Sequence, residues 1–134
     1  GYFDANEIQH HNQVDRIFIN LSNHPSAKWS EGQLEAAKQY GEVIDIDFPS
    51  VDSMADEALL DELVNHYVNK ILYISNGKEA TVHVMGEMTF TYRLVCALKE
   101  YGIKCVASTT ERISHDNGDG TKTSEFKFIK LRSY

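Results

Sequence analysis

The stretch "HVMGEMTFTYRLV" (His83 to Val95) decides the fold, because it changes from one hydrophobic pattern to another within a few residues. Its start completes "TVHVM" (81–85), a short run with little polar alternation, which is typical of a strand covered on both faces. Phe90, Leu94 and Val95 then follow at helical spacing. A strand that passes through a Gly-Glu-Met-Thr corner into a helix predicts a parallel sheet with crossover helices.

The same alternation of strand and helix continues on both sides of the corner. A Ser30/Gln33 capping box marks one helix start, Gly41 and Gly102 mark helix ends, and "HDNGDG" (115–120) marks a turn. The order is βαβαβαββ, which predicts an α/β, Rossmann-like three-layer sandwich with a mostly parallel sheet, strand order 2-1-3-4 and an antiparallel C-terminal edge strand. Strands are expected at 14–21, 43–48, 81–85, 103–114 and 121–134, and helices at 31–40, 56–75 and 90–101.

Length and composition indicate one domain. The chain has 134 residues, of which 42% are hydrophobic, enough for a single core. Residues 1–13 show no sustained period and are expected to be a flexible N-terminal extension, with the domain at 14–134. Cys96 and Cys105 lie in apolar patterns and are expected to be reduced, buried thiols.

Charge and hydropathy narrow the classes of partner. A formal net charge of −7 opposes sequence-independent binding to duplex nucleic acid, because that binding depends on neutralising phosphates. No apolar run approaches about 20 residues and no signal peptide is visible, so we expect a cytoplasmic protein without a membrane span.

Ligands of such sheets collect outside the carboxyl ends of the strands where the winding reverses, here between the first and third strands. That rule places the loop "SNHPSAKWS" (22–30) beside the corner "GEMT" (86–89). Ordinary caps and turns use the same residue types, so a purely structural role stays open for each of them. The neutral donors and acceptors expected near this point are Asn20, Ser22, Asn23, His24, Ser26, Thr91, Ser108 and Thr109.

The corner has the composition of an anion site. Gly86 permits close backbone approach or a positive φ, and Thr89 can cap the following helix so that its amides face an anion. Glu87 can favour the helix dipole or accept from a nucleotide, and Met88 lies between these two residues. His24 can act as acid, base or phosphate donor, or bond to the backbone as a structural loop residue.

Aromatic and basic residues complete the candidate site. Trp29 can stack on a base or cover the first helix against the sheet. Arg112 is the best candidate for a phosphate contact and Lys28 the second, although both can be surface residues. His83 has no visible partner in the sequence and is expected to be structural.

Other sequence signatures are absent. The chain has no Walker loop, no G-x-G-x-x-G, no C-x-x-C, no H-E-x-x-H and no nucleophile elbow. The acidic segment 45–57 lacks the spacing of a calcium loop. We therefore expect neither a metal nor a cofactor.

Three segments resemble a family of small bacterial proteins associated with CRISPR systems, related to CRISPR-associated Rossmann-fold (CARF) domains. They are "INLSNHPSAKWSEGQLEAAKQYG", "HVMGEMTFTYRLVCALKEYGIKCVASTTER" and "FKFIKLRSY", and the similarity covers most of residues 14–134. The resemblance implies a homodimer that binds a cyclic oligoadenylate messenger of antiviral defence. Some small relatives are ring nucleases, which open the messenger without metal through attack by a ribose 2′-hydroxyl.

Carried onto this chain, the resemblance implies that residues 22–26 contact phosphate or ribose and that residues 86–89 hold phosphate or adenine. His24 and Glu87 are the residues expected to assist chemistry. Three alternatives stay open: a non-catalytic module that senses or sequesters a nucleotide, a Rossmann-like enzyme acting on another phosphorylated metabolite, and an interaction protein that uses its acidic surface.

Overall fold

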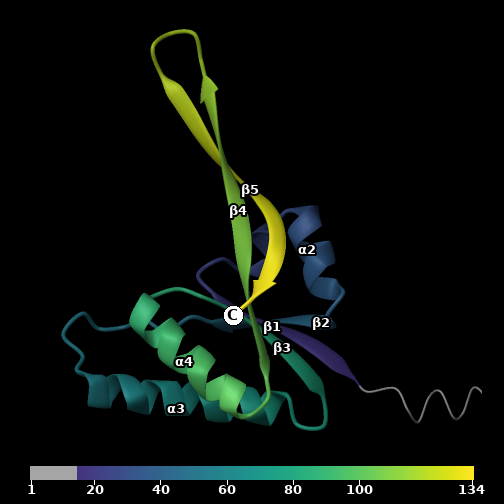
Figure 1. Cartoon of the computed structure of the whole chain (residues 1–134), viewed down its shortest axis with the longest axis vertical. Helices are drawn as coiled ribbons and strands as arrows, with labels where there is room; N and C mark the ends of the chain where they lie inside the picture. Colours follow the sequence, from purple (N-terminus) through teal and green to yellow (C-terminus); the bar gives the residue numbers. More distant parts are fainter. Residues whose placement is uncertain (1–14) are drawn as a thin grey trace, which may run out of the picture.

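The computed structural model describes residues 15–134 and contains one five-stranded sheet in the order β2-β1-β3-β4-β5 (Figure 1). The expected flexible extension 1–13, and Val14 at the predicted start of the first strand, lie outside the described residues. The elements are β1 (Arg16–Ser22), the short 3-10 helix η1 (Ser26–Lys28), α2 (Glu31–Lys38), β2 (Glu42–Asp47), α3 (Glu57–Ile74), β3 (Glu79–Met85), α4 (Met88–Glu100), β4 (Lys104–Asp116) and β5 (Lys122–Ser133).

The predicted fold class and strand order are confirmed. Strand β1 pairs in parallel with β2 on one side and β3 on the other, β3 pairs in parallel with β4, and β5 closes the edge antiparallel to β4. The carboxyl ends of β1 and β3 therefore lie side by side at the point where the winding reverses.

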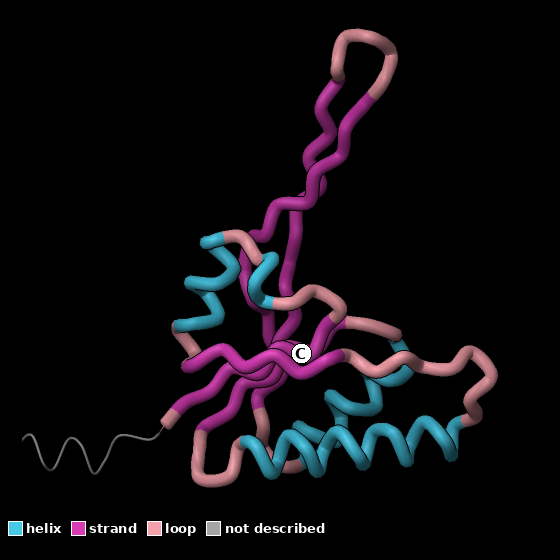
Figure 2. The backbone as a smooth tube through the Cα atoms, turned by 180° about the vertical axis from the view of Figure 1, so that it is seen from behind, coloured by secondary structure: helices cyan, strands magenta, loops and turns pink. Residues whose placement is uncertain are grey.

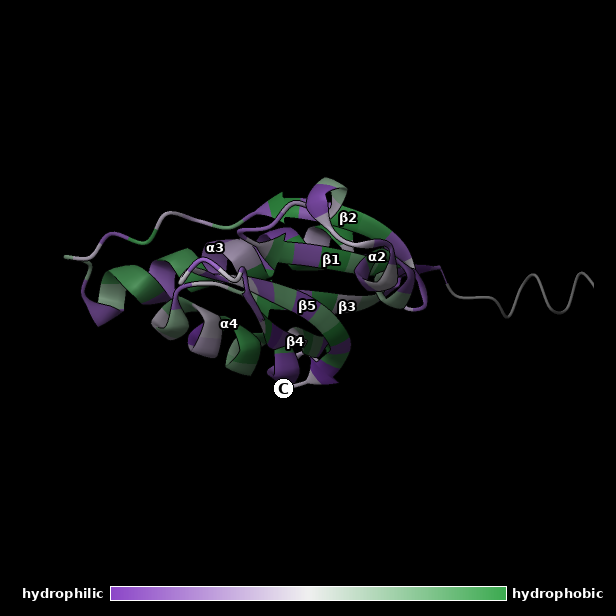
Figure 3. Cartoon of the chain, turned by 90° about the horizontal axis from the view of Figure 1, so that it is seen from above, coloured by the Kyte–Doolittle hydropathy of each residue, from purple (hydrophilic) through white to green (hydrophobic). Residues whose placement is uncertain are grey.

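The sheet is covered on both faces, as Figure 3 shows from above, with α2 on one side and α3 and α4 on the other. Side chains alternate along β1, so Ile17, Ile19 and Leu21 enter the larger core under α3 and α4. Phe18 faces the smaller core under α2, where it packs with Ala37 and Val106. The α2 face is less apolar, and it is the face that carries the polar groups described below.

Side-chain caps set the helix starts. Ser30 accepts a hydrogen bond from Gln33 N, and Asp56 accepts one from Leu59 N. The predicted Ser30/Gln33 capping box forms only in part, because the Gln33 side chain does not turn back to the helix start. Its amide Nε2 donates instead to Ser108 Oγ, 3.1 Å away on β4.

Strands β4 and β5 extend beyond the helices as a long hairpin (Figure 2). The pairing shifts register between Thr109 and Thr110, which marks a β-bulge near the point where the hairpin leaves the body. Phe126 lies on this hairpin with 68% of its surface exposed.

The two cysteines differ in burial. Cys105 is buried, and that burial raises the pKa of its thiol to about 11. Cys96 is exposed on α4, so the expectation that both thiols are buried is wrong for this residue.

None of the helices in the described part of the chain combines the length and apolar character needed to cross a membrane.

Candidate functional site

A cavity of about 410 Å³ opens on the α2 face, beside the carboxyl ends of β1 and β3. We call it the α2-side crevice. It brings together the loop after β1, the start of α2, the end of β3 and the base of the β4–β5 hairpin, which Figure 1 places next to one another. Its lining residues are Ser22, His24, Lys28, Trp29, Gln33, His83, Met85, Ser108, Thr110 and Phe126.

The loop after β1 is anchored by hydrogen bonds to buried and neighbouring groups. The carbonyl oxygen of His24 accepts from Asn20 Nδ2 at 2.8 Å and from Trp29 Nε1 at 3.1 Å. Ser26 donates to Asp45 through its hydroxyl at 2.8 Å and through its backbone N–H at 3.2 Å. These bonds leave the His24 ring exposed at the crevice while its backbone is fixed.

A row of polar side chains crosses the sheet beneath the crevice. The register places Asn20 of β1 directly between Asp45 of β2 and His83 of β3, so the three side chains share one face. Asn20 Nδ2 lies 2.9 Å from Asp45 Oδ1, and Asn20 Oδ1 lies 3.0 Å from His83 Nδ1. The row ends at Ser108 of β4, whose hydroxyl oxygen lies 2.7 Å from His83 Nε2.

The hydrogen-bond partners fix the tautomer of His83. Asn20 Nδ2 faces a carboxylate oxygen of Asp45 and the carbonyl oxygen of His24, which only accept. Its Oδ1 therefore faces His83, and because an amide oxygen cannot donate, the proton must be on His83 Nδ1. His83 Nε2 is left with a free lone pair, so the Ser108 hydroxyl donates to it.

Burial keeps this imidazole neutral. His83 is only 2% exposed, and it packs edge-on against Trp29 with ring centroids 5.5 Å apart. Burial, and secondarily the charge of nearby His24, lower the pKa of His83 to about 4. At neutral pH the ring is an uncharged acceptor, and its partner Ser108 is half-buried in the crevice wall.

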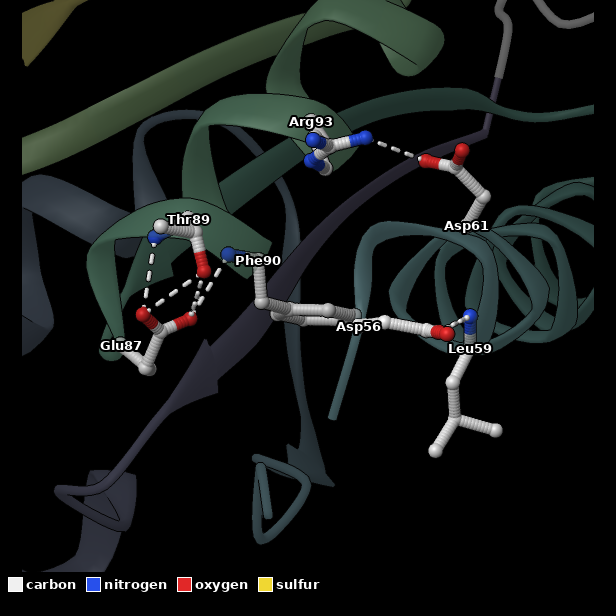
Figure 4. Close-up of polar contacts among 7 residues, drawn as sticks. All are labelled: Asp56, Leu59, Asp61, Glu87, Thr89, Phe90 and Arg93. Atoms are coloured by element: carbon white, nitrogen blue, oxygen red, sulfur yellow. Dashed lines mark hydrogen bonds and ion pairs between the residues drawn. The ribbon is translucent and has the colours of Figure 1, made fainter. Parts of the chain in front are cut away.

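At the corner that follows β3, the backbone amides at the start of α4 are hydrogen-bonded within the protein. Glu87, and not Thr89, caps α4, and its carboxylate accepts from Thr89 N at 3.0 Å and from Phe90 N at 2.8 Å (Figure 4). These backbone bonds, that of Phe90 first, together with the Thr89 hydroxyl, lower the pKa of the Glu87 carboxyl. The amides that were expected to face a ligand are thus occupied by the helix's own carboxylate, and a catalytic role of Glu87 stays a prediction.

Gly86 is required by packing. Of the two alternatives expected for Gly86, the structure shows close approach and not a positive φ. A Cβ at this position would come closer than 3.0 Å to the Phe48 ring, a separation that side-chain carbons essentially never show. Phe48 in turn packs edge-on against Phe90, with ring centroids 5.3 Å apart, at the edge of the larger core.

Gly86→Ala should therefore lower the free energy of unfolding by about 1–3 kcal/mol, because Phe48 must move out of its packing site. Gly32→Ala is the matched control, since a Cβ there meets nothing within 4 Å and alanine in helix α2 is favourable. Urea denaturation measures both. A Gly86→Ala variant that unfolds at the native midpoint would contradict this assignment.

Three of the predicted ligand-binding residues lie in a second cavity, on the α4 side of the sheet. Gly86, Met88 and Thr91 help to line this cavity of about 490 Å³, and it meets the α2-side crevice only at Met85. Thr91 is buried there, and its hydroxyl oxygen has no hydrogen-bond partner among the described residues. The loop after β1 and the Gly-Glu-Met-Thr corner therefore belong to two different cavities.

The two candidate cations lie in different places, and only Lys28 is at the crevice. Arg112 lies on the projecting hairpin, where its guanidinium donates to Ser124 Oγ at 3.1 and 3.3 Å, and it is not among the residues that line the crevice. Lys28 lines the crevice instead. Thr109 exchanges hydrogen bonds with the Lys130 backbone at the bulge, and Asn23 lines a smaller cavity beside β2.

Sequence reasoning missed five lining residues: Gln33, His83, Met85, Thr110 and Phe126. A signal for His83 was present, because it is the one ionisable residue within an otherwise apolar run on a strand beside the switch point. Gln33 was read as half of a capping box, and Phe126 as part of an alternating strand. Within residues 15–134, no three His, Cys, Asp or Glu side chains gather as a metal site.

A family model described as "Uncharacterized protein MJ1673 family" matches residues 16–132. The match runs from the first residue of β1 to Arg132 in β5, and it therefore includes every residue of the α2-side crevice. No curated protein matches the chain.

Proposed function

The chain belongs to the MJ1673 family, and we propose that it binds a cyclic oligoadenylate messenger in the α2-side crevice and opens it without a metal ion. The observation that carries this proposal is the hydrogen-bonded row Asp45–Asn20–His83–Ser108, which is buried at Asn20 and His83 and ends at the crevice wall. The choice of this messenger follows the resemblance to CARF proteins, as do the role in CRISPR-associated antiviral defence and the homodimer.

The composition of the crevice suits a nucleotide. Two aromatic side chains line the crevice, Trp29 from the loop after β1 and Phe126 from β5. Stacking of a base on such a side chain contributes about 1–3 kcal/mol. Gln33 and Thr110 offer side-chain hydrogen-bonding groups for base edges or ribose hydroxyls. The volume of about 410 Å³ lies in the ordinary range for small-molecule sites and suits one nucleotide unit better than a whole ring.

Positive charge is available for one phosphate. Lys28 and His24 are exposed side chains of the same loop, and both line the crevice. An ammonium group and an imidazole can stabilise the charge that develops on phosphate oxygens during cleavage. Fixed positioning of the reacting groups supplies the rest of the rate increase, which needs neither a metal nor a conspicuous motif.

The test is incubation of the purified protein, in EDTA, with cyclic tri-, tetra- and hexa-adenylate, with products resolved by chromatography and mass spectrometry. Lys28→Ala and His24→Ala remove crevice groups, while Met88→Ala alters only the α4-side cavity. We expect linear adenylates from the native protein and from Met88→Ala, with at least about a 100-fold lower rate in one of the crevice variants.

Other outcomes would contradict the proposal in distinguishable ways. Intact ligand together with a thermal shift would mean that the protein is a binder and not a nuclease. Intact ligand without any shift would overturn the nucleotide assignment as a whole. Equal activity in all variants would overturn the placement of the reaction in the α2-side crevice.

A further inference from the structure

We propose that Ser108 is a nucleophile activated by His83, so that the crevice cleaves phosphate esters through a covalent seryl phosphate. The array has the parts that nucleophilic catalysis needs: a hydroxyl on a base, and a third group that orients the base. The first distance is 2.7 Å, from Ser108 Oγ to His83 Nε2, and the second is 3.0 Å, from His83 Nδ1 to Asn20 Oδ1. The proposal rests on the site of the proposed function, and it puts the Ser108 hydroxyl in place of the ribose 2′-hydroxyl as the attacking group.

Access to the base points to Ser108 and not to a hydroxyl of the ligand. His83 is 2% exposed, and its lone pair is already covered by the Ser108 hydroxyl. A ribose hydroxyl could reach His83 Nε2 only by displacing Ser108 from the wall of the crevice. Ser108 itself is half-buried and lines the crevice, so it is the group through which the buried base meets a ligand.

The path of the backbone explains why the Ser108 hydroxyl lies beside His83 Nε2. Strands β3 and β4 pair only from Thr81 to His83, opposite Lys104 to Val106, and then part. Beyond the last pair, the Ser108 amide donates to Met85 Sδ at 3.2 Å, in place of a neighbouring carbonyl. The gap leaves the Ser108 side chain room to meet both the imidazole and the Gln33 amide, which donates to it at 3.1 Å.

The steps balance without a further reactant except water. Ser108 Oγ bonds to phosphorus while the bond from phosphorus to the leaving ribose oxygen breaks, and the Ser108 proton passes to His83 Nε2 and then to that oxygen. The seryl phosphate is still joined to the linear product through its other ester bond. Water then attacks the phosphorus and gives a proton to His83 Nε2, and this proton passes to Ser108 Oγ as the bond from phosphorus to Oγ breaks. Ser108 is restored, and a terminal phosphate is left on the linear product. Asn20 Oδ1 accepts from His83 Nδ1 throughout and so holds the ring in place.

Diisopropyl fluorophosphate, which phosphorylates activated serine hydroxyls, tests the proposal without any nucleotide. The full chain is treated at neutral pH, its intact mass is measured, and the modified residue is located by peptide mapping. We expect a single adduct at Ser108, formed at least about 100-fold more slowly in His83→Gln. Ser114→Ala is the matched control, because it removes an exposed hydroxyl of the same strand, β4, outside the crevice.

Mapping on the native chain gives a result even if a variant fails to fold. An adduct on another residue, no adduct, or an equal rate in a folded His83→Gln variant would overturn the assignment of Ser108. Because the reagent carries no base or ribose, a negative result would leave nucleotide binding untouched. Failure of all adenylates to bind, with Ser108 still labelled, would instead overturn the proposed function alone.

Discussion

Between pH 7 and pH 4, the free energy of unfolding should fall by about 3 kcal/mol more in the native protein than in a His83→Gln variant. In the folded chain the pKa of His83 is lowered from 6.5 to about 4 by burial and by His24, whereas in the unfolded chain the ring takes up a proton near 6.5. The folded state therefore binds fewer protons in this window. Its stability is full above pH 6.5 and is lost as the pH falls toward 4.

Urea denaturation at a series of pH values measures this difference. Both proteins lose stability to other titrating groups, so only the difference between the two curves reports on His83. His66→Gln, which removes an exposed histidine on α3, is the control and should keep the native curve. Parallel curves for the native protein and His83→Gln would show that the imidazole is not held neutral in the fold.

Asn20→Ala should lower the free energy of unfolding by about 1–3 kcal/mol, because it leaves the buried N–H at His83 Nδ1 without its acceptor. Asn20 is 1% exposed, and its amide bonds Asp45, His83, Ser22 and the carbonyl of His24 at 2.8–3.0 Å. The His24 carbonyl keeps Trp29 as a donor and Asp45 keeps Ser26. Among the described residues, His83 Nδ1 has no acceptor besides Asn20 Oδ1. The same variant should lose the orientation of the His83 ring and with it the reactivity of Ser108.

Asn23→Ala is the matched control for this change, since Asn23 is an exposed asparagine three residues away. It should change the free energy of unfolding by no more than about 0.5 kcal/mol. Chemical denaturation of both variants, with labelling by diisopropyl fluorophosphate alongside, separates stability from reactivity. A stable Asn20→Ala protein that still labels at the native rate would contradict the role of Asn20.

The architecture could be predicted because its signals are local. The change of period at the Gly-Glu-Met-Thr corner, the cap at Ser30 and the turn at 115–120 each constrain a few neighbouring residues. Element order then leaves few topologies, and the observed order β2-β1-β3-β4-β5 is the predicted one. The switch-point rule likewise placed Ser22, His24, Trp29 and Ser108 at the crevice that they line.

The rest of the candidate site depends on which of several possible partners each polar group bonds. Thr89 and Glu87 are both able to cap α4. The sequence does not show which of them does so, and in the structure it is the Glu87 carboxylate. The Gln33 side chain does not complete the capping box, and it donates instead to Ser108, which lies 75 positions further along the chain. The pairing of β1 with β3 places Asn20 beside His83, and the separation of β3 from β4 beyond His83 places Ser108 beside it. Neither feature can be predicted from residues 81–85.

The most direct test of the crevice as a nucleotide site is a nuclear magnetic resonance titration with cyclic tetra-adenylate. Trp29 is the single tryptophan of the chain, so its indole N–H gives one unambiguous signal within the crevice. We expect this signal and the Ser108 amide to shift on binding, while Tyr92 and Cys96 of the α4-side cavity stay unchanged. Shifts confined to Tyr92 and Cys96, or no shifts at all, would show that the α2-side crevice does not hold the nucleotide.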